Sequence, residues 1–155
     1  MRTAAERQNI VTGAGDQDAV GMARSAAGVC VQIFFIRGGK MIGREHFLLR
    51  GSEEESDADI LRAFLEQYYN QATFVPREVL LPCAIDAAAQ ATIEAWLAAR
   101  KGGGKVALLT PQRGTKHDIV QMATGNAAKF LADEETRRSI LDEQTLGAVE
   151  ELGRY

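Results

Sequence analysis

Carboxylates at three separated points of this sequence are the first candidates for chemistry, because converging acids can hold divalent metal ions. They are Asp18, Asp59 and Asp86. Two of them also have ordinary explanations: Asp59 stands three residues after Ser56, the spacing of a helix-capping box, and Asp86 suits the N-cap of the next helix. The strand of Asp18 has Gly21-Met22 at its middle, which offers no hard ligand. The sequence therefore predicts no metal, no cofactor and no catalytic residue, with a two-metal site of the three aspartates as the alternative.

Two groups of basic residues could hold phosphate. The run Arg113-Gly114-Thr115-Lys116 follows a predicted strand and opens a predicted helix, so free backbone N–H groups would join Arg113 and Lys116 around an anion. Arg37, Lys40 and Arg44 on a predicted hairpin could form a second patch. Ordinary solvated charges, which keep hairpin tips and sheet edges from aggregating, are the alternative at both places.

Net charge, cysteine spacing and hydropathy argue against several classes of protein. The net charge of −3 over 155 residues argues weakly against a stand-alone nucleic-acid binder. Cys30, Cys83 and His46 have no zinc-binding spacing, and we expect two reduced buried thiols and a histidine that is exposed or has its polar atoms satisfied. No apolar run approaches 18 residues and the N-terminus has no signal-peptide core, so we expect a cytoplasmic protein without a membrane segment.

The element that must position these side chains is the hairpin over residues 29–49. Residues 29–36 are apolar on both faces apart from Gln32, which predicts a strand covered on both sides. Gly38-Gly39 can adopt the positive φ angles of a tight primed turn. Residues 41–49 alternate more and should lie nearer an edge of the sheet. A shorter strand at 18–23 would precede them, which makes an antiparallel meander.

Strands and helices alternate through the rest of the chain, in the order helix 56–69, strand 77–81, helix 86–101, strand 105–109, helix 116–131 capped by Thr115, and a more polar helix 136–152 after an acidic break at 133–135. Strand–helix–strand connections of this length join parallel strands through right-handed crossovers. A meander followed by parallel strands, with helices on both faces, predicts an α/β fold of the ribonuclease H-like type. Its five-stranded mixed sheet would have the order 3-2-1-4-5.

Several segments in the same order resemble the central region of UvrC, the nuclease subunit of the bacterial excinuclease ABC system. They are ERQNIV (6–11), VQIFFIRGGKMIGREHF (31–47), FLEQYY (64–69), FVPREVLLP (74–82) and PQRG (111–114). The resemblance implies a role in nucleotide excision repair, in which UvrC proteins make both incisions beside a DNA lesion after UvrA and UvrB have located it. Neither nuclease motif of that family is present in this sequence, so no catalytic residue can be assigned from it.

The resemblance and the predicted elements together suggest three parts: residues 1–17 as a linker from the UvrB-interacting segment, 18–132 as a degenerate ribonuclease H-like domain, and 133–155 as a helical connector toward the C-terminal nuclease. We expect a catalytically inactive scaffold module that acts in the cytoplasm, within the SOS response. Its partners would be UvrB, the other UvrC domains and damaged DNA. An active two-metal endonuclease and a DNA-binding module without chemistry remain the alternatives, the latter through Arg113, Lys116, Arg37, Lys40 and Arg44.

Overall fold

The computed structural model describes residues 15–26, 28–50 and 54–152, with side chains as far as residue 137. Most of the predicted N-terminal linker therefore lies outside the described residues. The elements are β1 (Gln17–Ser25), β2 (Gly28–Arg37), β3 (Lys40–Leu49), α2 (Asp57–Gln71), β4 (Glu78–Leu80), α3 (Ala87–Lys101), β5 (Ala107–Leu109) and α4 (Gly114–Leu152).

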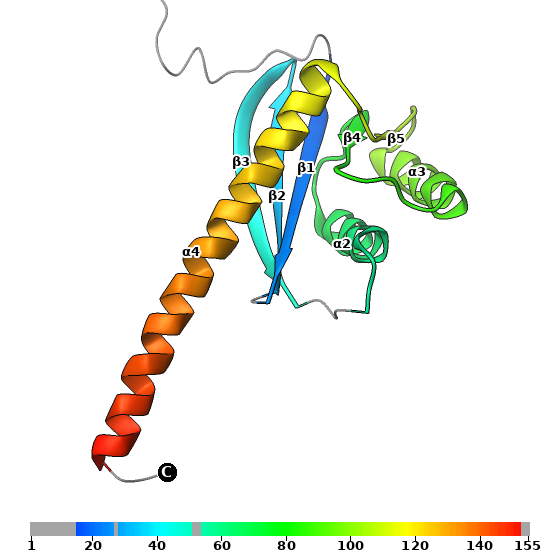
Figure 1. Cartoon of the computed structure of the whole chain (residues 1–155). Helices are drawn as coiled ribbons and strands as arrows, with labels where there is room; N and C mark the ends of the chain where they lie inside the picture. The colour runs from blue at the N-terminus through cyan, green and yellow to red at the C-terminus, as the bar shows by residue number, and fades with distance from the viewer. Residues whose placement is uncertain (1–14, 27, 51–53, 153–155) are drawn as a thin grey trace, which may run out of the picture.

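The five strands form one mixed sheet in the order β3-β2-β1-β4-β5, as predicted (Figure 1). β1, β2 and β3 pair antiparallel, and β4 and β5 add to the β1 side in parallel. The helices that return the chain to each parallel strand, α2 and α3, are long enough for crossover connections. The α/β fold with helices on both faces is thus of the predicted ribonuclease H-like type.

The glycine turn of the central hairpin has the predicted geometry, because Gly38 and Gly39 have φ angles of 61° and 83°. β2 lies between two strands and is buried along almost its whole length, whereas β3 is an edge strand with alternating exposure. The register of this pair shifts between Phe35 and Ile36, which marks a β-bulge near the turn.

Local capping explains where two helices begin and where one ends. The Ser56 hydroxyl accepts a hydrogen bond from the backbone N–H of Asp59 at 3.1 Å, and the Asp86 carboxylate accepts from two N–H groups in the first turn of α3. Gly102 ends α3 with a φ angle of 90°, the left-handed conformation common at helix C-termini. Two of the three acids of the alternative metal site, Asp59 and Asp86, therefore stand at helix starts.

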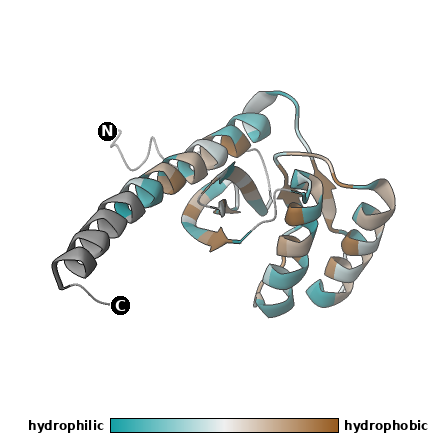
Figure 2. Cartoon of the chain, turned by 60° about the horizontal axis from the view of Figure 1, so that its bottom comes forward, coloured by the Kyte–Doolittle hydropathy of each residue, from teal (hydrophilic) through white to brown (hydrophobic). Residues whose placement is uncertain are grey.

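Two layers cover the sheet, with α2 and α3 on one face and α4 on the other (Figures 1 and 2). The larger core lies under α2 and α3 and includes Ile33, Leu65 and Leu97. The core under α4 is thinner, and there the helix lies almost directly on β1. A Cβ atom at Gly21 would be 2.2 Å from the backbone nitrogen of Thr124, so only glycine permits this approach.

The prediction of two C-terminal helices was wrong, because α4 runs without a break from Gly114 to Leu152. Asp133, Glu134 and Glu135 contain no helix breaker, and their charges are compatible with an exposed helix surface. The helix also begins before Thr115, so this residue lies inside the first turn rather than at the predicted cap. Figure 1 shows that α4 extends well beyond the sheet.

Candidate functional site

The first two residues of β1 direct their side chains to opposite faces of the sheet, as successive strand residues do. Asp18 faces α2 and is only 1% exposed. Its Oδ1 accepts a hydrogen bond from Arg37 Nη1 at 3.0 Å, and its Oδ2 accepts one from the Tyr69 hydroxyl at 2.5 Å. Both carboxylate oxygens are therefore occupied by groups of the protein itself.

Burial dominates the electrostatics of this cluster. It raises the pKa of Asp18 above its ordinary value, although the hydrogen bond from Tyr69 and the charge of Arg37 act in the opposite direction. Burial and the neighbouring Asp18 charge raise the pKa of Tyr69 well above 10. The pKa of Tyr68 rises to about 12, because burial and the charges of Asp18 and Glu45 disfavour its ionised form. Tyr69 therefore stays protonated and acts as a hydrogen-bond donor.

A second polar group lies around the start of β1 and β4. Glu78 Oε1 accepts hydrogen bonds from Lys116 Nζ at 2.8 Å and from Gln17 Nε2 at 3.2 Å. Arg37 Nη1 also donates to the Gln17 carbonyl at 3.1 Å, which links this group to the Asp18 cluster. The strand starts are thus joined to the hairpin and to the first turn of α4 by polar contacts of side chains.

The three acids of the alternative metal site are not brought together. Asp59 and Asp86 stand at the starts of α2 and α3, while Asp18 is enclosed at the start of β1. Within the described ranges, no group of three or more His, Cys, Asp or Glu side chains could hold a metal ion. The geometry therefore does not favour two-metal chemistry by these aspartates.

Four of the five predicted phosphate contacts lie at one end of the molecule. Ile36 and Met41 from the hairpin pack against Ile119 and Val120 of α4, so the hairpin turn lies beside the helix start (Figure 1). Arg37 and Lys40 flank that turn, and Arg113 and Lys116 flank the helix start; Arg44 lies further along β3. The charges of Arg37 and Lys116 are shared with Asp18 and Glu78, whereas Lys40, Arg44 and Arg113 are exposed.

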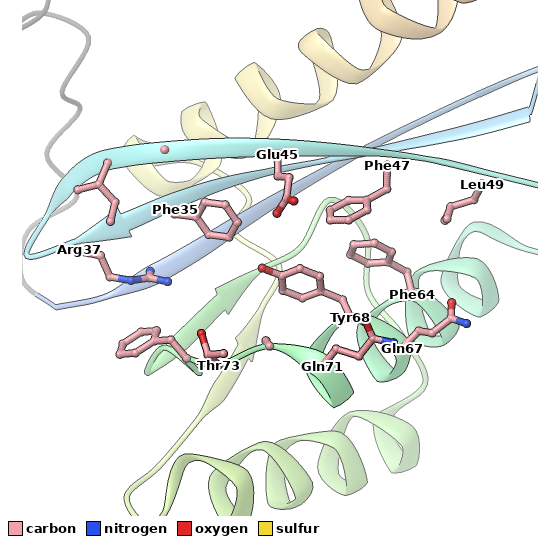
Figure 3. A pocket seen from close by; sticks show the side chains of 14 residues that line it. Phe35, Arg37, Glu45, Phe47, Leu49, Phe64, Gln67, Tyr68, Gln71 and Thr73 are labelled. Carbon is pink, nitrogen blue, oxygen red and sulfur yellow. The ribbon is translucent and has the colours of Figure 1, made fainter.

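An aromatic groove of about 680 Å³ lies between β3 and the C-terminal half of α2, and the sequence patterns did not predict it. The ring of Phe47 lies 5.3 Å from that of Phe64 and 5.6 Å from that of Tyr68. Figure 3 shows these rings along the groove, with Glu45 directed into it from β3. The three rings come from edge strand and helix positions that looked like core in the sequence.

The remaining candidates have structural environments. Cys30 is buried and Cys83 half-buried, both are free, and burial raises the pKa of each thiol. The His46 ring lies 4.0 Å from that of Phe130 on α4. No helix in the described part of the chain combines the length and the apolar character needed to cross a membrane.

The sequence patterns missed the Asp18–Arg37–Tyr69 cluster for a simple reason. Its three members are far apart in the chain. Each could be explained locally: Asp18 as a strand-start residue, Arg37 as a solvated hairpin charge and Tyr69 as a core aromatic residue. An aspartate at the start of a strand that is otherwise apolar was the available signal, because such a carboxylate needs a partner when the strand is buried.

Comparison with known proteins gives consistent matches. A family model described as the UvrC ribonuclease H-like domain matches residues 16–134. A UvrABC system protein C of Clostridioides difficile (strain 630) is 39% identical over 88% of this chain and 22% of the relative, and one of Acetivibrio thermocellus is 41% identical over 82% and 20%. One from Lachnospira eligens is 34% identical over the whole chain and 25% of the relative. The chain thus spans about a fifth to a quarter of the length of these relatives.

Proposed function

This chain belongs to the UvrC ribonuclease H-like domain family, and from that premise we propose that it is a catalytically inactive scaffold module. In a UvrABC system it would hold the parts of the incision subunit in position relative to one another, to UvrB and to damaged DNA. That system would act in the cytoplasm, as part of the SOS response. The fold would contribute a rigid body rather than an active site.

The observation that carries the proposal is the environment of Asp18. A metal-binding carboxylate needs free lone pairs that face an accessible site. Asp18 instead accepts from Arg37 and from Tyr69, and it is almost fully buried. A metal ion there would have to displace both partners and would lie beside the Arg37 cation, which opposes binding.

The test is a nicking assay on supercoiled plasmid with Mg²⁺ or Mn²⁺ in excess. We expect no cleavage by this chain and none by the Asp18→Asn variant. Cleavage by the natural sequence that disappears in Asp18→Asn, but persists in the exposed-surface control Glu66→Gln, would establish the active-nuclease alternative instead. The control lies on the solvent side of α2, where its carboxylate pairs with Arg62.

DNA contact without chemistry is a second candidate, favoured by the grouping of basic residues at the hairpin turn and the start of α4. It predicts duplex binding that weakens with salt, as phosphate contacts require. Changing Arg113 and Lys40 together to alanine should weaken duplex binding and reduce its salt dependence, while Lys129→Ala on α4 should not. Equal effects of both changes would mean that no defined patch exists.

A further inference from the structure

The aromatic groove is lined mainly by apolar side chains, and among its aromatic rings Phe74 is the most exposed of those described. Phe35, Phe47, Phe64, Tyr68 and Phe74 all line it. Phe74 is 45% exposed, and the Arg37 guanidinium lies 4.3 Å from the centre of its ring. Aromatic rings arranged along an open groove provide stacking surfaces for flat ligands.

A second, basic pocket of about 310 Å³ adjoins this groove. Its charged side chains are Arg77, Arg100, Lys101 and Asp16. Among the residues that the structure describes, neither Arg77 nor Lys101 forms an ion pair, and Asp16 accepts a hydrogen bond from the Gly38 N–H. The pocket therefore carries an excess of positive charge that the described part of the protein does not neutralise.

The two pockets are adjacent, because Ala72, Thr73 and Phe74 line both of them. We propose that they form one site for an unpaired nucleotide of a nucleic-acid strand. The base would enter the aromatic groove and stack near Phe74, and its phosphate would lie in the basic pocket. Stacking on aromatic rings beside a positively charged track is the usual way in which proteins bind single strands.

The position of Glu45 sets the orientation of the ligand. Its carboxylate points into the aromatic groove, where Arg37 is the one cation among the described lining residues, so phosphate is favoured in the basic pocket with its three cations (Figure 3). A carboxylate accepts hydrogen bonds from exocyclic amino groups of bases, such as N4 of cytosine. Thymine presents its single N–H between two carbonyl oxygens, so we infer a preference for cytosine over thymine.

This site goes beyond the proposed scaffold role and does not depend on it. It lies on the α2 face of the sheet, whereas Arg113 precedes α4, the helix of the opposite face, and it requires a base out of its stack rather than a paired duplex. An inactive scaffold could lack it, and a nuclease could possess it. Evidence against one proposal would therefore not count against the other.

The experiment is fluorescence anisotropy of short labelled oligodeoxycytidine and oligodeoxythymidine at low and moderate salt, with a paired duplex of mixed sequence beside them. We expect tighter binding of oligodeoxycytidine than of either competitor. Phe74→Ala should weaken binding about tenfold, as loss of one stacked base does. Arg77→Ala with Lys101→Ala should lower the slope of log affinity against log salt by about 0.7 or more.

Matched controls use exposed residues on the opposite face of the sheet. Met122→Ala controls for loss of an apolar side chain and Lys129→Ala for loss of a cation, and neither should change binding. Glu45→Ala should remove the preference for cytosine without abolishing binding. Circular dichroism of every variant checks that the fold is retained.

Three results would overturn the site. The first is no binding of either oligonucleotide at low salt. The second is binding that Phe74→Ala leaves unchanged, which would assign the open rings to another occupant such as a protein segment added to the β3 edge. The third is an equal loss with Lys129→Ala and with the paired Arg77 and Lys101 changes, which would mean diffuse attraction.

Discussion

At the scale of single residues, Asp18 shows how neighbouring groups compensate for the burial of a carboxylate. Taking a charge out of water is costly unless hydrogen bonds and an opposite charge compensate. Arg37 supplies the charge from the hairpin, and Tyr69 supplies a hydrogen bond from α2. The cluster joins three elements, so its polar contacts constrain how the hairpin, β1 and α2 meet.

The raised pKa of Asp18 predicts a pH dependence of stability with a definite sign. A carboxyl group whose pKa is higher in the folded chain holds more protons there than in the unfolded chain, so its contribution to the free energy of unfolding falls as pH rises. The fall begins near the ordinary pKa of 3.8 and ends above the raised value. We expect the free energy of unfolding of the natural chain, minus that of Asp18→Asn, to decrease as the pH rises across this window.

Urea unfolding of both proteins at a series of pH values measures this difference, and other titrating groups cancel in it. Carboxyl chemical shifts from NMR give the Asp18 pKa directly. Tyr69→Phe removes a hydrogen bond that lowers this pKa, so the pKa should rise further in that variant. A stability difference that increases with pH would contradict the raised value.

At the scale of elements, the contact between α4 and β1 depends on one missing side chain. The helix backbone at Thr124 occupies the space where a Cβ of Gly21 would be. Because this neighbour is backbone in a regular helix, it cannot move aside without shifting α4 as a whole. The distance between helix and sheet on this face is therefore determined at a single position.

Gly21→Ala should consequently destabilise the domain by about 3 kcal/mol or more, since overpacking displaces a whole helix. Gly125→Ala is the matched control on α4, because a Cβ there meets nothing within 4 Å. That change should stabilise by about 0.5–1 kcal/mol, the gain from replacing glycine inside a helix. Thermal and urea unfolding of both variants measure the two effects. A small loss of stability in Gly21→Ala would contradict this prediction and would show that α4 can move away from the sheet.

At the scale of the whole molecule, the described core contacts of α4 are confined to its first part. The buried residues of this helix are Ile119, Val120, Ala123, Ala127 and Leu131. Figure 1 shows the rest of the helix extending past the sheet. The first part of α4 therefore belongs to the domain by its packing.

A chain that ends at Arg137 should accordingly keep the fold. Its melting temperature should change by no more than about 2 °C, with a smaller helical signal in circular dichroism. A chain that ends at Asn126 is the contrast, because it loses Ala127 and Leu131 from the core under α4, and it should melt at a clearly lower temperature. A large loss for the longer truncation would mean that the end of α4 stabilises the domain.

The types of the elements and most helix ends could be predicted, because they depend on local signals, whereas the strand order of the sheet was predicted by analogy with the ribonuclease H-like architecture. Apolar periodicity, the Gly38-Gly39 turn and the caps at Ser56 and Asp86 act over a few residues, and each worked as expected. The break in α4 was predicted wrongly from a run of acids, since acidity alone does not end a helix. Apolar periodicity shows which face of a helix or strand is buried, but the charges along a helix do not show where it ends.

The sequence by itself determined the family, the architecture and the lack of an evident nuclease motif. Only the tertiary structure decided that Asp18 meets Arg37 and Tyr69, that α4 approaches β1 at Gly21, and that aromatic rings of β3 and α2 form an open groove beside a basic pocket. The physical reason is that these features join residues distant in the chain. Their partners are chosen by how the layers pack, and no local pattern records that choice.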